Sequence, residues 1–158
     1  MPDGIEAKPY QSIIGRLASL QNAPEFRPHL TIGSVRSPID LDAFAQGNSS
    51  ISLNAVKIEA EPVFTRSLVI SFDKTDALMN LRSQIESLPD FTSNRPFNPH
   101  ISLCYGEPPR GASEFPDVHQ LLGKSVTFTR LAQMEIKLPV NCYDAVSAWR
   151  ERSSVSLL

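Results

Sequence analysis

One five-residue pattern occurs twice in the chain and limits its possible folds more than any other feature. Residues 28–32 read P-H-L-T-I and residues 99–103 read P-H-I-S-L, so both copies are proline, histidine, aliphatic, hydroxyl, aliphatic. Successive side chains of a strand point to opposite faces, so the histidine and the hydroxyl share one face and the aliphatic residues share the other. Both copies are therefore predicted to be strands with one face in the core and one polar face.

A predicted helix precedes each copy. Apolar residues recur at helical spacing in residues 10–22 and 76–88. Pro24 follows the first helix and Pro89 ends the second, where Asp76 is the expected N-terminal cap. The chain is therefore expected to consist of two related halves, each with a helix followed by a histidine-bearing strand.

The remaining apolar runs predict an antiparallel α+β fold. Apolar residues with strand-like patterning occupy the runs 29–35, 51–60, 66–73, 100–105, 125–137 and 141–149. Residues 4–8 are expected to form an opening strand. Residues 106–124 are predicted to be a loop with a short helix near 117–122. Duplicated halves suggest two lobes about a pseudo-twofold axis, with the two motif strands facing each other across a central cleft.

Length and charge limit the classes of function. A chain of 158 residues suits a single domain, 1–158, and is expected to be a monomer. Its formal charge of −2 provides no broad basic field, so no long nucleic acid is expected as a partner. No apolar run approaches the ~20 residues of a membrane span, so a soluble, cytoplasmic protein is expected. Cys104 and Cys142 lack C-x-x-C spacing and are expected to be reduced thiols.

The paired motifs suit phosphodiester hydrolysis. An imidazole has a pKa near 6.5, so one histidine can take a proton from water while the other delivers one to the leaving oxygen. In-line displacement places these two groups on opposite sides of phosphorus. His29 and His100 are therefore the candidate catalytic residues. Thr31 and Ser102 are candidates for binding the non-bridging oxygens, and no metal or other cofactor is expected.

The paired H-x-[S/T] motifs resemble those of the two-histidine phosphoesterase superfamily. Within it, F-x-P-H-x-T at 26–31 and P-H-I-S-L-C-Y-G at 99–106 are most similar to cyclic phosphodiesterases of the plant and fungal type. This resemblance implies a bilobal α+β fold in which two antiparallel-sheet lobes with flanking helices surround a central cleft. It implies hydrolysis of ADP-ribose 1″,2″-cyclic phosphate and nucleoside 2′,3′-cyclic phosphates without a metal. Through the family, it points to the metabolism of tRNA-splicing by-products.

The resemblance also assigns a substrate-binding role to Tyr105. Strict alternation along the strand would turn Tyr105 toward the core, so this role needs a bulge or a strand end near Cys104. One departure from the family concerns residues 4–8, which lack the aromatic residues that such members often carry there. Trp149 is expected to lie in the core on the last strand, and His119 is expected to be a solvated loop residue.

Three other functions remain open on the sequence. An enzyme of the same fold could act on RNA ends or on 2′–5′-linked oligonucleotides. A non-catalytic module could bind nucleotides, although binding alone would not need two imidazoles. A zinc site built on His29 and His100 is the least favoured, because no third ligand has suitable spacing. Glu59 and Glu61 are interpreted as capping or surface charges.

Overall fold

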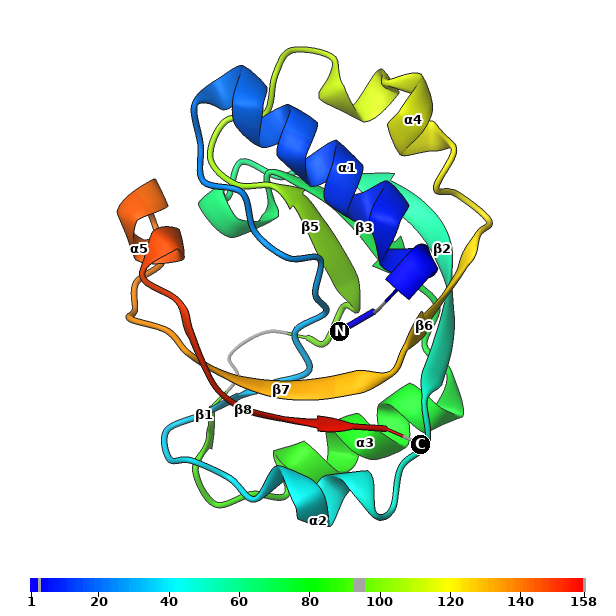
Figure 1. The fold of residues 1–158 in the computed structure, drawn as a ribbon, viewed down its shortest axis with the longest axis vertical. Helices are drawn as coiled ribbons and strands as arrows, with labels where there is room; N and C mark the ends of the chain where they lie inside the picture. The colour runs from blue at the N-terminus through cyan, green and yellow to red at the C-terminus, as the bar shows by residue number, and fades with distance from the viewer. Residues whose placement is uncertain (3, 93–95, 158) are drawn as a thin grey trace.

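The computed structural model describes residues 1–2, 4–92 and 96–157, and the fold is α+β, as predicted. A four-stranded antiparallel sheet has the order β5-β3-β2-β6 and curls into a half-barrel (Figure 1). Its strands are β2 (Ile51–Glu59), β3 (Leu68–Phe72), β5 (His100–Cys104) and β6 (Ser125–Phe128). Two smaller antiparallel pairs join β1 (Ser34–Val35) to β4 (Phe91–Thr92) and β7 (Arg130–Glu135) to β8 (Arg150–Ser156).

Helices lie at both ends of the molecule (Figure 1). α1 (Gly4–Gln21) and α4 (Pro116–His119) lie at one end, and α2 (Leu41–Ala45) and α3 (Asp76–Glu86) lie at the other. α5 (Tyr143–Ser147) stands apart, between β7 and β8 in the sequence, and two short 3-10 turns complete the order: η1 (Phe64–Arg66) and η2 (Ala112–Glu114). Among the described residues, no helix is both long enough and apolar enough to cross a bilayer.

Apolar spacing explains the main elements. In β2, Ile51, Leu53 and Ala55 are buried while the residues between them are exposed, which is the period of a strand with one face in the core. All five residues of β3 are buried, as expected for a strand inside the sheet. The helix predicted at 76–88 is present as α3, but Thr75 and not Asp76 caps it, by accepting from Leu78 N at 3.4 Å.

The helix of each half packs on the motif segment of the other half. α1, which precedes the first motif, lies on β5, which carries the second. α3, which precedes the second motif, reaches the first: the Arg82 guanidinium donates to the Ile32 carbonyl. A side chain at Gly33 would meet Phe91 and Ile85, so this glycine permits the close approach of α3. The two halves are therefore interlocked through their helices.

Two strand predictions are wrong. Residues 4–8 belong to α1, where Glu6 accepts from the Thr127 amide and thereby ties the helix to β6. Residues 141–149 contain the helix α5, in which Asp144 occupies the favourable first turn and only Val146 is buried. The last strand is instead β8, whose polar sequence has no apolar alternation by which a strand could be predicted.

Two further strand predictions are correct only in part. The run 125–137 divides at Thr129 into β6 and β7, which pair with different partners. The run 29–35 is extended, but it forms a single bridge at Leu30 before the two residues of β1. The first motif is thus held mainly by isolated contacts, whereas the second belongs to β5 and pairs with β3 at four positions.

Candidate active site

The two histidine motifs lie side by side. Leu30 and Ile101 form an antiparallel bridge, which extends the half-barrel beyond β5. Because the pairing is antiparallel, its register places His29 across from Ser102 and Thr31 across from His100. Ile101 is buried and Leu30 packs against the same core, so the histidines and hydroxyls occupy the opposite, polar face. Two imidazoles and two hydroxyls from distant parts of the chain therefore share one surface.

The two histidines are held in the same way. His29 Nδ1 lies 2.8 Å from the Arg27 carbonyl oxygen, and His100 Nδ1 lies 2.7 Å from the Asn98 carbonyl oxygen. A carbonyl oxygen only accepts, so Nδ1 is the donor in both rings and a neutral ring keeps an unprotonated Nε2. Each motif thus presents a basic Nε2 whose ring is oriented by the backbone two residues earlier.

The surroundings of the two imidazoles differ. Burial lowers the pKa of both histidines below the usual 6.5, and the backbone hydrogen bonds partly oppose this. Aromatic rings surround His29: the centroid of Phe26 is 6.2 Å away and that of Trp149 is 5.6 Å away. The N-terminus and His100 lower the His29 pKa further, whereas charges of both signs act on His100. Arg66 lowers its pKa further, while Glu61 and Glu59 raise it.

Tyr105 lies at the site because β5 contains a bulge. Leu68 pairs with Cys104 but Val69 pairs with Ser102, so β5 has one extra residue there. The Tyr105 hydroxyl lies 3.5 Å from His29 Nε2, a long hydrogen bond. Its side chain is only 5% exposed, and this burial raises the pKa of its hydroxyl, so Tyr105 stays protonated and donates to His29.

A cluster of aromatic rings surrounds Tyr105. The Phe26 ring lies 4.3 Å from it, the Phe64 ring is nearly parallel at 6.2 Å, and the Trp149 ring is 5.7 Å away. Trp149 was predicted to lie on the last strand in the core, but it follows α5 and contacts His29. No sequence signal identifies this position, because it depends on where the α5 helix ends.

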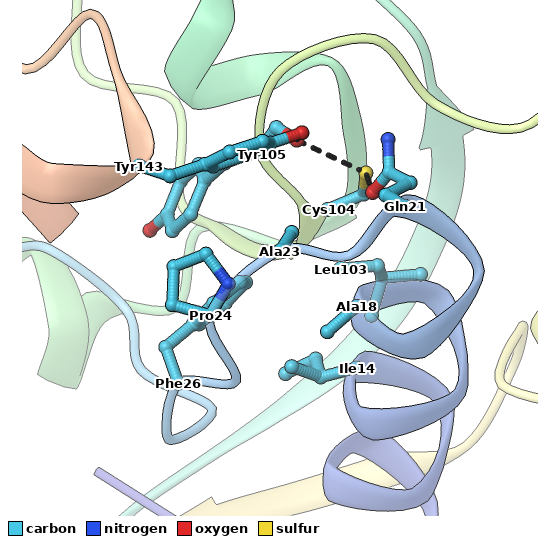
Figure 2. A pocket seen from close by; sticks show the side chains of 10 residues that line it. All are labelled: Ile14, Ala18, Gln21, Ala23, Pro24, Phe26, Leu103, Cys104, Tyr105 and Tyr143. Atoms are coloured by element: carbon cyan, nitrogen blue, oxygen red, sulfur yellow. Dashed lines mark hydrogen bonds between the residues drawn. The ribbon is translucent and has the colours of Figure 1, made fainter. Parts of the chain in front are cut away.

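The cavity behind Tyr105 is too small for a substrate. Figure 2 shows Cys104, Gln21 and Pro24 among its lining residues, with Tyr143 alongside the tyrosine. Its volume of about 10 Å³ holds one water at most. Cys104 is buried, with Sγ 2.8 Å from Gln21 Oε1, and both cysteines are free thiols. This cavity therefore has no room for a nucleotide.

The two motif hydroxyls differ in their availability. Thr31 is exposed on the polar face. Ser102 is only 5% exposed, and its hydroxyl donates to the Thr65 carbonyl oxygen at 2.9 Å. The Ser102 hydrogen is thus already engaged by the η1 turn.

The Glu59 carboxylate is linked to His100 through Asn98. Glu59 accepts hydrogen bonds from Ser71, from Asn98 Nδ2 at 3.3 Å and from Lys57 at 3.1 Å. These hydrogen bonds, and most of all the one from Ser71, lower the Glu59 pKa to about 2. Burial acts in the opposite direction and is outweighed. Glu59 was interpreted as a capping or surface charge; its side chain is 21% exposed and is also held by three hydrogen bonds. Because Asn98 also orients the His100 ring, Glu59 supports the second motif indirectly.

The remaining candidates lie away from the site. His119 is exposed, as predicted, but it is the last residue of the helix α4 and not a loop residue. No group of three His, Cys, Asp or Glu side chains within the described part of the chain is arranged to hold a metal ion. A scan against protein-family models and a search of curated proteins found no match to this chain.

Proposed function

We propose that this chain is an enzyme that hydrolyses cyclic phosphodiesters by general acid and base catalysis with two histidines. The observation that carries the proposal is the pairing of the motifs at Leu30 and Ile101, with His29 and His100 each held through Nδ1 by a backbone carbonyl. A reaction that needs one proton acceptor and one proton donor fits two imidazoles whose Nδ1 atoms are held by the backbone and whose Nε2 atoms are not.

His29 acts as the base in this proposal. Its Nε2 removes a proton from water as the water oxygen attacks phosphorus. The aromatic surroundings disfavour the charged imidazolium in the resting protein, so His29 is neutral before the reaction. The Tyr105 hydroxyl turns away from Nε2 or shifts to the attacking water.

His100 acts as the acid. Its protonated Nε2 donates to the ribose oxygen as the bond between that oxygen and phosphorus breaks, so the product is a phosphomonoester with a free hydroxyl. Burial and Arg66 lower the His100 pKa and Glu61 and Glu59 oppose this, whereas no carboxylate among the described residues raises the pKa of His29. This difference in neighbouring carboxylates supports the assignment of His100 as the acid and His29 as the base.

The proposed substrates are nucleoside 2′,3′-cyclic phosphates and ADP-ribose 1″,2″-cyclic phosphate. The resemblance of both motifs to the two-histidine phosphoesterase superfamily supports this choice, as does the exchange of helices between the halves, which suits a bilobal pseudo-twofold fold. The free thiols are compatible with a place in the cytoplasm, where thiols stay reduced.

Phosphorus NMR of 2′,3′-cyclic AMP and ADP-ribose 1″,2″-cyclic phosphate with excess EDTA tests the proposal. Conversion of either compound to a single phosphomonoester by the wild type, and not by His100→Ala, is the expected result. Activity that disappears with EDTA would favour a metal enzyme. Binding of nucleotides without turnover would leave a binding module, and cleavage of RNA ends alone would move the substrate to another branch of the superfamily.

A further inference from the structure

An arginine lies beside the second motif. Arg66 is the last residue of η1, and the neighbouring Thr65 carbonyl accepts the hydrogen bond from Ser102. The charge of Arg66 is close enough to His100 to disfavour its protonation. Arg66 therefore lies next to the polar face on which a phosphate would bind, although its sequence context gives no indication of this.

The hydrogen-bonding capacity of Arg66 is only partly used. Its Nη2 lies 2.8 Å from Glu61 Oε1, and the two side chains are 17% and 36% exposed. Its Nε is buried, and it has no acceptor among the described residues. A buried donor without an acceptor is unfavourable, and a guanidinium presents its Nε and Nη hydrogens as a fork that matches two phosphate oxygens.

Ser102 is not free to act as a second donor to the phosphate. Transition-state charge gathers on the non-bridging oxygens, and Thr31 can donate to one of them. Ser102, which the resemblance assigns to the other, has its hydrogen on the Thr65 carbonyl and is buried. Using Ser102 would require this hydrogen bond to break, whereas Arg66 needs only to loosen a partly exposed ion pair.

We propose that Arg66 is a catalytic residue that binds a non-bridging oxygen of the cyclic phosphate and is held by Glu61 until the substrate replaces it. This inference rests on the proposed function. It makes Glu61 a competitor of the substrate, so the two members of one ion pair are expected to have opposite effects when they are replaced.

Steady-state kinetics with 2′,3′-cyclic AMP, measured at the pH optimum of each variant, tests this reversal. Arg66→Gln should lower kcat/KM by roughly 10²–10³-fold, the usual effect of removing one donor to a transition-state oxyanion. Arg66→Lys should recover part of the loss, because it keeps the charge but not the fork. Glu61→Gln should lower KM for the substrate and Ki for inorganic phosphate. Arg16→Gln, which breaks the remote pair with Asp117, is the matched control and should change neither.

A purely structural ion pair gives a different pattern. Arg66→Gln and Glu61→Gln would then lower the melting temperature alike and leave KM and the phosphate Ki unchanged, which would overturn the inference. The Glu61→Gln result decides the matter even when Arg66→Gln does not fold. A wild type that hydrolyses no cyclic phosphate refutes the proposed function instead, and the phosphate affinities of the same variants still decide whether Arg66 binds the anion.

Discussion

The backbone of Leu30 pairs with the backbone of Ile101 and joins two segments that lie 71 residues apart in the chain. Both residues turn their side chains to the core, so the bridge fixes which residues of each motif face outward. It brings the two histidines onto one surface without a side-chain contact between them. Any displacement of the first motif relative to β5 therefore changes the separation of the two imidazoles.

Loss of either imidazole is expected to remove catalysis while the fold persists. His29→Ala and His100→Ala should each lower kcat by about 10²–10⁴-fold, because each ring supplies one proton transfer. His119→Ala is the control, since that residue is exposed at the end of α4 and should leave kcat unchanged. Turnover of 2′,3′-cyclic AMP and circular dichroism of the same samples check the prediction. Wild-type turnover in either active-site variant would contradict it.

The pH optimum is expected to lie on the acid side of the usual imidazole range. His29 must be neutral to accept a proton and His100 must be protonated to donate one, and burial lowers the pKa of both from 6.5. Both limbs of the kcat/KM profile should therefore lie below pH 6.5. Glu59→Gln removes a charge that raises the His100 pKa, so only the alkaline limb should move to lower pH. An alkaline limb that stays in place in this variant would argue against the assigned roles.

Stability in acid is expected to depend on Glu59. Its pKa is about 2 in the folded protein, against the ordinary value of 4.5 without these hydrogen-bond partners. Its contribution to the free energy of unfolding is therefore fully present above pH 4.5 and is lost as the pH falls toward 2. The difference in unfolding free energy between the wild type and Glu59→Gln should therefore shrink across this window. Urea denaturation at pH 6, 4 and 3 measures it. Glu135→Gln, which affects an exposed pair with Arg152, is the control and should show little change.

The first motif is expected to depend on a buried arginine of α3. Arg82 donates to the Ile32 carbonyl, and its guanidinium lies 4.7 Å from the Phe91 ring centroid and 4.8 Å from that of Phe97. Arg82→Leu leaves that carbonyl without its donor, which should cost about 2–3 kcal/mol of unfolding free energy, the scale of a hydrogen bond to a charged group.

Replacing the partner of Arg82 separates charge pairing from this hydrogen bond. Glu86 is half exposed on the same helix, so Glu86→Gln should cost less than about 1 kcal/mol, as for surface ion pairs. Because Arg82 holds the backbone beside Thr31, Arg82→Leu should also lower kcat/KM in the protein that remains folded. Equal losses of stability in the two variants would show that the ion pair matters and the bond to Ile32 does not.

Side-chain periodicity predicted the elements that face the core. The apolar spacing of 76–88 and the alternation of 51–60 correspond to α3 and β2 because burial determines both. β8 was missed because its pairing with β7 is a backbone property that its polar sequence does not reveal. The helix at 143–147 was missed for a related reason: a short amphipathic run of mixed residues fits either structure.

Only the candidate site residues that belong to the repeated motif, or directly follow it, were predictable from the sequence. His29, His100, Thr31 and Ser102 follow from the repeat, and Tyr105 needed the bulge that β5 contains. Arg66, Glu59 and Trp149 stand outside any local pattern, because tertiary contacts of η1, of β2 and of the segment after α5 bring them beside the motifs. The sequence of a motif does not indicate which residues from other elements will lie beside it in the fold.

The exchange of helices between the halves means that neither half encloses its own motif. A chain that ends before β5 has α1 without the strand that it covers, and a chain that begins after β1 has α3 without the Ile32 carbonyl that Arg82 binds. The two imidazoles take their native positions only when these long-range contacts have formed. Under the proposed function, turnover would therefore be measured only for the native state, and partly folded forms would have no activity.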